Sequence, residues 1–143
     1  LPELWDFFTN LPTTVVVDHM GRPDVSKPVD GEEFNLFVKL MAEHPNIWSK
    51  LSCPERLSKT GPKALDGEKN AYQDVAPFAR RLMELFPERV LWGTDWPHPN
   101  LKNHMPDDGL LVEYIAQIAP TEAERQQLLV NNPMRLYWPE EVA

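Results

Sequence analysis

Three short apolar runs, separated by stretches with helical spacing, most strongly limit what this chain can fold into. The runs are TTVVVDH (13–19), NIWSKLSC (46–53) and RVLWGTD (89–95), and they are rich in β-branched and aromatic residues. They show little alternation of polar and apolar residues, which is typical of parallel strands covered on both faces. Helical patterns before, between and after them give the order α-β-α-β-α-β-α-α. The sequence therefore predicts an α/β fold built on a parallel sheet.

The helical stretches carry apolar residues on one stripe and recognisable start signals. Helices are predicted over residues 1–11, 30–43, 71–86, 107–118 and 121–131. Asp30 with Glu33, and Thr121 with Glu124, have the spacing of a capping box, in which each residue bonds to the backbone N–H of the other. Pro133 is predicted to end the last helix, because proline has no N–H to donate and its ring clashes with the preceding turn.

Three parallel strands cannot close into a barrel, and as an open sheet they leave two unpaired edges. The 143 residues have the length of one ordinary domain. Two architectures are consistent with this pattern: a small open α/β domain, or the C-terminal part of a (β/α)8 TIM barrel whose earlier strands are missing from this chain. The second is preferred, with residues 1–143 as one partial barrel domain that could self-associate through its exposed edges. Residues 54–70 are predicted to form a long polar loop, of the kind that often covers a functional site.

Charge and cysteine content limit the partners. The chain has 14 Lys and Arg against 22 Asp and Glu, a net charge of −8. Nucleic acids and anionic membranes bind basic faces, so neither is an expected partner.

Cys53 is the single cysteine and cannot form an internal disulfide, and no apolar run approaches the roughly 18 residues of a membrane helix. The protein is expected to be cytoplasmic, and an anionic ligand would need local arginines.

Chemically useful side chains follow each predicted strand at its carboxyl end. His19 and Arg22 follow the first strand, Arg56 follows the second, and Asp95 ends the third. Ligands of parallel α/β folds bind outside the carboxyl ends of the strands, so these side chains are expected to converge on one pocket. Each also has a plain structural interpretation, as a hydrogen-bonded core histidine, a turn-capping aspartate or a surface arginine. No cysteine or histidine spacing fits a structural zinc site, and no phosphate-binding glycine motif is present.

Four motifs together resemble the C-terminal half of the amidohydrolase superfamily. They are VVVDHMGRPD, KLSCPERL, VLWGTDWPHPN and NNPMRLYW, and they extend from residue 15 to residue 138. More narrowly, they are similar to the metal-independent lactonase branch of that superfamily. The resemblance implies that the strands ending at His19, Ser52 and Asp95 are barrel strands 6, 7 and 8.

The resemblance also implies an activity. Members of this branch hydrolyse lactones that carry carboxylates, such as 2-pyrone-4,6-dicarboxylate, in the degradation of aromatic, lignin-derived compounds. Asp95 matches the strand-8 aspartate that deprotonates the hydrolytic water, and His19 matches the histidine that polarises the reacting carbonyl. Four further residues are assigned by the resemblance to substrate binding: Arg22, Arg56, His98 and Asn100. No metal and no other cofactor is implied.

Two other classes of function stay open. A metal-dependent hydrolase or decarboxylase of the same superfamily would use Asp95 and His19 as ligands of a divalent metal such as zinc. A small open α/β domain could instead serve binding or interaction without catalysis. The family's HxH pair at the end of strand 1 and its site residues on strands 2 to 5 are not in this chain. The isolated chain is therefore expected to be inactive.

Overall fold

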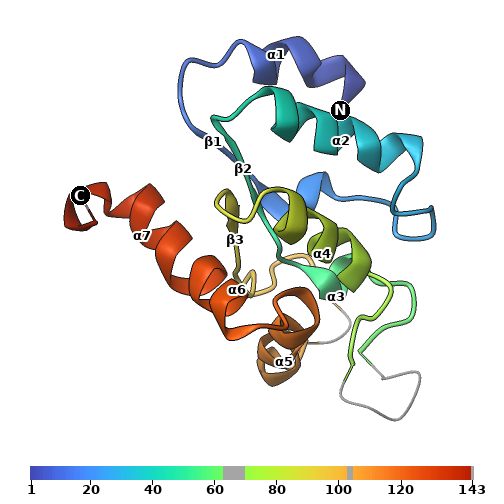
Figure 1. Cartoon of the computed structure of the whole chain (residues 1–143). Helices are drawn as coiled ribbons and strands as arrows, with labels where there is room; N and C mark the ends of the chain where they lie inside the picture. Colours follow the sequence, from blue (N-terminus) through green and yellow to red (C-terminus); the bar gives the residue numbers. More distant parts are fainter. Residues whose placement is uncertain (63–69, 103–104, 143) are drawn as a thin grey trace.

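A computed structural model describes residues 1–62, 70–102 and 105–142, and it confirms the predicted order of helices and strands (Figure 1). The elements are η1 (Pro2–Leu4), α1 (Trp5–Thr9), β1 (Val15–Val17), η2 (Asp18–Gly21), α2 (Glu32–Glu43), β2 (Ile47–Lys50), α3 (Pro54–Leu57), α4 (Ala76–Leu85), β3 (Val90–Leu91), α5 (Asp108–Ile118), α6 (Glu122–Gln126), η3 (Gln127–Asn131), α7 (Asn132–Tyr137) and η4 (Pro139–Glu141). Across these residues, no helix has both the length and the apolar character needed to span a bilayer.

The three strands form one parallel sheet in the order β1-β2-β3, as predicted. Val16 pairs with Trp48, and Ser49 pairs with Val90. The strands are shorter than the apolar runs that predicted them, because the residues after each strand leave the ladder and enter tight turns. Within the described residues, β1 and β3 each pair with one neighbour, so both lie at edges of the sheet. The β-strand residues of β1 are only half-buried, whereas Ile47, Trp48 and Ser49 of β2 are buried.

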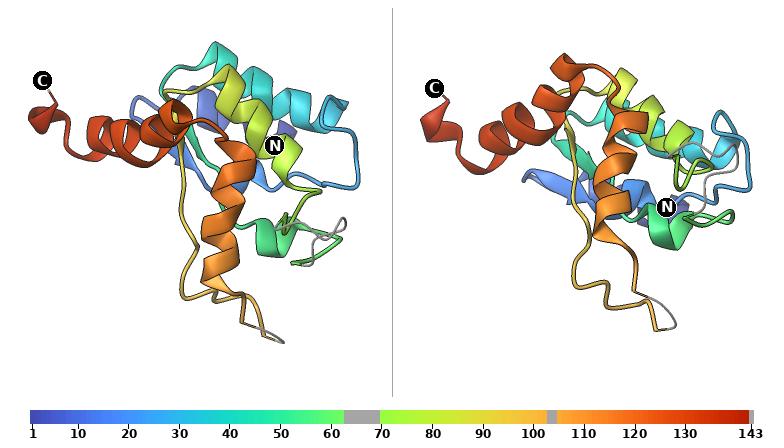
Figure 2. Two further views of the ribbon diagram at one scale, coloured as in Figure 1. Left: turned by 60° about the horizontal axis from the view of Figure 1, so that its bottom comes forward. Right: turned by 90° about the horizontal axis from the view of Figure 1, so that it is seen from below.

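Helices α2 and α4 and the C-terminal helices lie on the same side of the sheet in both views of Figure 2. An edge-to-face contact joins α2 to α4: the rings of Phe34 and Phe78 lie 5.0 Å apart at an interplanar angle of 71°. The core beneath them includes Leu40, Ile47 and Leu82, whose side chains are fully buried. This apolar layer fixes the strands, and hence the turns at their carboxyl ends, in place.

One of the two predicted capping boxes forms and the other does not. Thr121 Oγ1 accepts a hydrogen bond from the Glu124 N–H at 3.2 Å, and Glu124 Oε2 accepts one from the Thr121 N–H at 3.1 Å. The predicted box of Asp30 with Glu33 is wrong, because the N-cap of α2 is Gly31 and has no side-chain cap. Glu33 instead accepts from Lys27 Nζ at 2.7 Å and from the backbone of the preceding loop. A stronger, charge-assisted partner therefore takes the carboxylate.

The prediction of a long loop over 54–70 is wrong at its start, since α3 forms there directly after β2. Proline at its first position suits a helix start, because the missing N–H would have no intrahelical partner. Residues 63–69, the middle of the predicted loop, lie outside the described residues.

The prediction that Pro133 ends the last helix is also wrong. Helix α7 continues through Pro133 to Tyr137. The preceding segment η3 is a π-type turn, in which hydrogen bonds span five residues instead of four. Pro133 therefore lies in the first turn after a change of hydrogen-bonding pattern, where its missing N–H costs little.

Candidate active site

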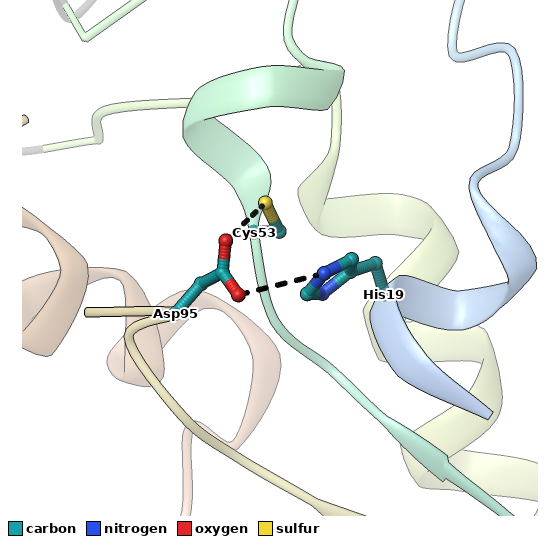
Figure 3. Close-up of side chains that lie close together, drawn as sticks. All are labelled: His19, Cys53 and Asp95. Atoms are coloured by element: carbon teal, nitrogen blue, oxygen red, sulfur yellow. Dashed lines mark hydrogen bonds and ion pairs between the residues drawn. The ribbon is translucent and has the colours of Figure 1, made fainter. Parts of the chain in front are cut away.

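Side chains from the three strand ends lie close together, and His19 and Asp95 are among them, as the sequence predicted. His19 comes from η2 after β1, Cys53 from the turn after β2, and Asp95 from the turn after β3. The potential ligand atoms of these three residues all lie within 4.8 Å of one another (Figure 3). The parallel pairing of β1, β2 and β3 places the turns side by side, so the convergence follows from the topology.

The backbone at these turns is unusual. Seven described non-glycine residues have a positive φ, and six of them follow the strand ends: His19, Met20, Arg22, Cys53, Asp95 and His98. Left-handed backbone at non-glycine residues costs roughly 1–3 kcal/mol each and is concentrated at functional sites. Such turns aim the side chains across the end of the sheet instead of along it. The strain is therefore located where a substrate site is expected.

Arg56, on α3, connects the three residues. Its Nη2 donates to Asp95 Oδ2 at 2.7 Å and lies 3.1 Å from His19 Nε2, and its Nε donates to Cys53 Sγ at 2.7 Å. The side chain of Arg56 is 12% exposed, so this ion pair is largely shielded from solvent. A partly buried, hydrogen-bonded pair of this kind holds its members much more firmly than a surface ion pair does.

The protonation of His19 follows from its neighbours. A guanidinium has no acceptor, so Nε2 must accept from Arg56 and Nδ1 must carry the proton. Nδ1 lies 2.8 Å from Ser52 Oγ, which can accept that proton. Burial lowers the pKa of His19, and the attraction of the nearby Asp95 carboxylate offsets this only in part. His19 is therefore neutral at neutral pH.

Sequence reasoning missed the contribution of Cys53. The sequence assigned Cys53 no role in the site, but the residue is buried at its centre and its Sγ lies 3.6 Å from Asp95 Oδ2. Burial raises the pKa of the thiol to about 12, more than the bond from Arg56 lowers it. Cys53 is therefore a neutral thiol. Its position at a strand end, three residues before Arg56, was the available signal.

A cleft of about 520 Å³ lies beside the cluster and is lined by Arg22, Glu55, Arg56, Asn100 and Leu101. Three of the four residues assigned to substrate binding thus share one cleft. Arg22 is exposed, and within the described residues its guanidinium has no hydrogen-bonding or ion-pair partner. A larger cavity of about 1080 Å³, bordered by α1 and α2, also includes Arg22, but it is lined mainly by apolar residues and does not include Arg56. Asp95 lines neither space, but its ion-pair partner Arg56 lines the smaller cleft. The smaller cleft is therefore the candidate substrate site.

His98 does not line this cleft. Its imidazole is buried, with Nδ1 3.3 Å from Glu55 Oε1 and Nε2 2.9 Å from Asp108 Oδ1. It joins the turn after β3 to α3 and to the first residue of α5. The sequence pattern gave no sign of this arrangement, because Glu55 lies 43 residues from His98 along the chain and Asp108 follows it after a loop.

His19, Cys53 and Asp95 also carry the kinds of atoms that ligate a metal. Imidazole nitrogen, thiolate and carboxylate are all ligands of zinc. In this structure, however, each of the three candidate ligands is bonded to the guanidinium of Arg56. A fixed positive charge at the centre of the cluster opposes a metal cation at the same place. As the chain stands, these residues do not fit a metal.

Comparisons with known proteins point to one protein family. Residues 1–138 match the amidohydrolase family. The 2-pyrone-4,6-dicarboxylate hydrolase of Comamonas testosteroni is 78% identical over 142 residues, which are 99% of this chain and 47% of that protein. The 4-sulfomuconolactone hydrolase of Hydrogenophaga intermedia is 40% identical over 137 residues, 94% of this chain and 42% of that protein.

A solved structure from Agrobacterium tumefaciens superposes with a TM-score of 0.76 at 32% identity, and covers 96% of this chain and 46% of that chain. The chain thus spans about half the length of the curated relatives it matches. The parallel sheet, the converging strand ends and the match over residues 1–138 agree: this chain belongs to the amidohydrolase family.

Proposed function

We propose that the complete protein carrying this chain is a cytoplasmic hydrolase that opens a carboxylated lactone, such as 2-pyrone-4,6-dicarboxylate, during the degradation of aromatic compounds. The observation that carries the proposal is a carboxylate, Asp95, held beside a cleft that two arginines line. The two relatives described above are named as hydrolases of lactones with acidic groups, which supports the same substrate class. Residues 1–143 would form about strands 6 to 8 of a (β/α)8 barrel, with β1 and β3 pairing onto further strands.

Asp95 is placed to act as the general base. It takes a proton from water as the water oxygen attacks the lactone carbonyl and a tetrahedral intermediate forms. The ring C–O bond then breaks, and its electron pair leaves on the enolate oxygen, which becomes a keto acid after protonation. Because an enolate is a stable leaving group, the step needs little acid assistance. Base catalysis of this kind is worth roughly 10²–10⁴-fold in rate.

His19 is placed to polarise the reacting carbonyl. In the ligand-free arrangement its Nε2 accepts from Arg56, so it cannot donate. The Ser52 hydroxyl beside Nδ1 can donate as well as accept, so it satisfies either tautomer of the ring. When a substrate carboxylate draws Arg56 away, the proton can reside on Nε2 and be donated to the carbonyl oxygen. A donor of this kind is worth on the order of 10²–10³-fold.

Arg22, Arg56 and Asn100 provide the anchors for the substrate. Arginine suits planar carboxylates because its guanidinium donates two parallel hydrogen bonds to them. Arg22 is exposed and has no hydrogen-bonding or ion-pair partner among the described residues, so it can bind without breaking a contact with any of them. Arg56 is bonded to Asp95, so a substrate carboxylate that binds Arg56 lies close to the general base. The buried His98 is proposed to hold the turn after β3 in position, through Glu55 and Asp108, without touching the substrate.

Replacing Arg22 by Met in the complete protein is expected to raise KM by about 10- to 100-fold while kcat changes little. A hydrogen bond to a charged group contributes about 1.5–3 kcal/mol, and Arg22 makes no contact with the base. Steady-state kinetics on the pyrone dicarboxylate measure both constants. The matched variant Lys27→Met, which removes an exposed cation already paired with Glu33, is expected to leave both unchanged. An unaltered KM in Arg22→Met would remove Arg22 from the anchor role.

The activity itself is tested by following the ultraviolet absorbance of 2-pyrone-4,6-dicarboxylate with the complete protein and excess chelator. Rapid loss of the pyrone band is the expected result. The proximity of His19, Cys53 and Asp95 favours one alternative, a metal-dependent hydrolase of the same family. Activity that disappears with chelator and returns with zinc would establish that alternative and contradict the metal-independent mechanism.

A further inference from the structure

The guanidinium of Arg56 lies where three potential metal ligands converge. We propose that Arg56 is a built-in substitute for a metal cation, and that its removal would convert His19, Cys53 and Asp95 into a site for zinc or a similar transition metal. This inference deepens the proposed function, because it gives a structural reason for chemistry without a metal. Its test reads metal binding and therefore does not depend on lactone hydrolysis.

The spacing of the potential ligand atoms matches that of a zinc site. His19 Nε2 lies 3.6 Å from Asp95 Oδ1, and Cys53 Sγ lies 3.6 Å from Asp95 Oδ2. Tetrahedral zinc with bonds of about 2.0–2.3 Å places neighbouring ligand atoms roughly 3.3–3.8 Å apart. Both measured distances fall inside that range. The His19–Asp95 and Cys53–Asp95 pairs therefore have the spacing of zinc ligands, and one ligand atom from each of the three residues lies within 4.8 Å of the others.

The potential ligand atoms all point at the guanidinium of Arg56. The Nε2 lone pair of His19 points at the guanidinium, because Arg56 can only donate. One oxygen of Asp95 and the sulfur of Cys53 accept from the same guanidinium. Each residue thus presents to Arg56 the atom that it would present to a metal. Guanidinium and metal compete for one place, since two cations there would repel each other strongly in a shielded site.

The chemical types of the three ligands determine which metal the site would prefer. Imidazole, thiolate and carboxylate together suit zinc and cobalt better than magnesium or calcium, which prefer oxygen ligands alone. A bound metal deprotonates a coordinating thiol, so Cys53 can bind as the thiolate with release of its proton, and the metal affinity is expected to rise with pH. Arg56 also lines the cleft, so its departure leaves a fourth position open toward substrate and water.

The test uses the complete protein and zinc or cobalt ions alone as the probe. Wild type, Arg56→Met and Arg56→Lys are dialysed against each metal, and bound metal per chain and the dissociation constant are measured. Arg56→Met is expected to bind one ion at this site about 10- to 100-fold more tightly than wild type, the scale of change typical when a group around a metal site is altered. Arg56→Lys keeps a cation and is expected to behave as wild type. Arg22→Met removes the same charge from the same cleft and is also expected to behave as wild type.

Cobalt identifies the ligands. A thiolate bound to cobalt gives an intense charge-transfer absorption in the near ultraviolet, which is expected in Arg56→Met and lost in Arg56→Met/Cys53→Ser. Circular dichroism verifies the fold of each variant, and Arg56→Gln replaces Arg56→Met if the latter does not fold. Equal zinc affinity of wild type and the neutral variants, or gained binding without the thiolate band, would overturn the proposal. Absence of lactonase activity in the wild-type complete protein, with the metal result as expected, would instead contradict the proposed function and leave this inference standing.

Discussion

Asp95→Asn in the complete protein is expected to lower kcat by about 10²–10⁴-fold while the substrate still binds. The carboxamide has nearly the shape of the carboxylate but cannot take a proton from water, so the rate advantage of a general base is lost. Substrate affinity should be kept or improved, because Arg56 loses its ion-pair partner at 2.7 Å and becomes freer to bind a substrate carboxylate. Single-turnover rates and equilibrium binding of the pyrone dicarboxylate separate the two effects.

Asp18→Asn is the matched control for this change. Asp18 adjoins His19 in the same turn, but its carboxylate is exposed and lies 2.8 Å from Lys50 Nζ. The same chemical substitution there should leave turnover within a small factor of wild type, because exposed ion pairs contribute little. Turnover by Asp95→Asn close to that of Asp18→Asn would show that another group activates the water.

Local pattern was sufficient to predict the parallel sheet and most of the helices. The β-branched run around Val16 and the apolar run around Ile47 have few alternatives to a buried strand. The errors arose where other local interactions compete with the signals used for the prediction. Glu33 pairs with Lys27 and therefore does not form a capping box. The π-type turn ends just before α7, so Pro133 lies in the first turn of a new helix and does not end one. Neither competitor is visible in the spacing that predicted the helix ends.

Only part of the candidate site's geometry was predictable from the sequence. Parallel strands bring their carboxyl ends together, so the meeting of His19 and Asp95 follows from the order of elements alone. The central position of Arg56 does not follow, because it depends on a helix directly after β2 and on left-handed backbone at Cys53. Side-chain direction in such turns is set by individual φ values, which sequence spacing does not encode.

Asn132→Ala is expected to destabilise the protein by about 2–4 kcal/mol, the largest stability effect proposed here. The side chain of Asn132 is fully buried, and its Nδ2 donates to the carbonyl oxygens of Pro87 and Val90, each at 2.7 Å. Alanine leaves both carbonyls without this donor, and each unsatisfied buried group costs roughly 1–3 kcal/mol. Urea unfolding should show a lower midpoint with an unchanged slope.

The neighbouring Asn131 gives a closely matched control, because it lies one residue away and is exposed. Asn131→Ala removes only surface contacts with glutamine side chains and is expected to change stability by less than about 0.5 kcal/mol. Asn132→Asp keeps the size of the side chain but replaces the donor by an acceptor, so it should destabilise at least as much as alanine. Val90 belongs to β3, whose following turn carries Asp95, so the loss of this anchor should also lower turnover before the protein unfolds. Equal stability of Asn131→Ala and Asn132→Ala would mean that packing of α7, and not these two hydrogen bonds, holds the C-terminal helices to the sheet.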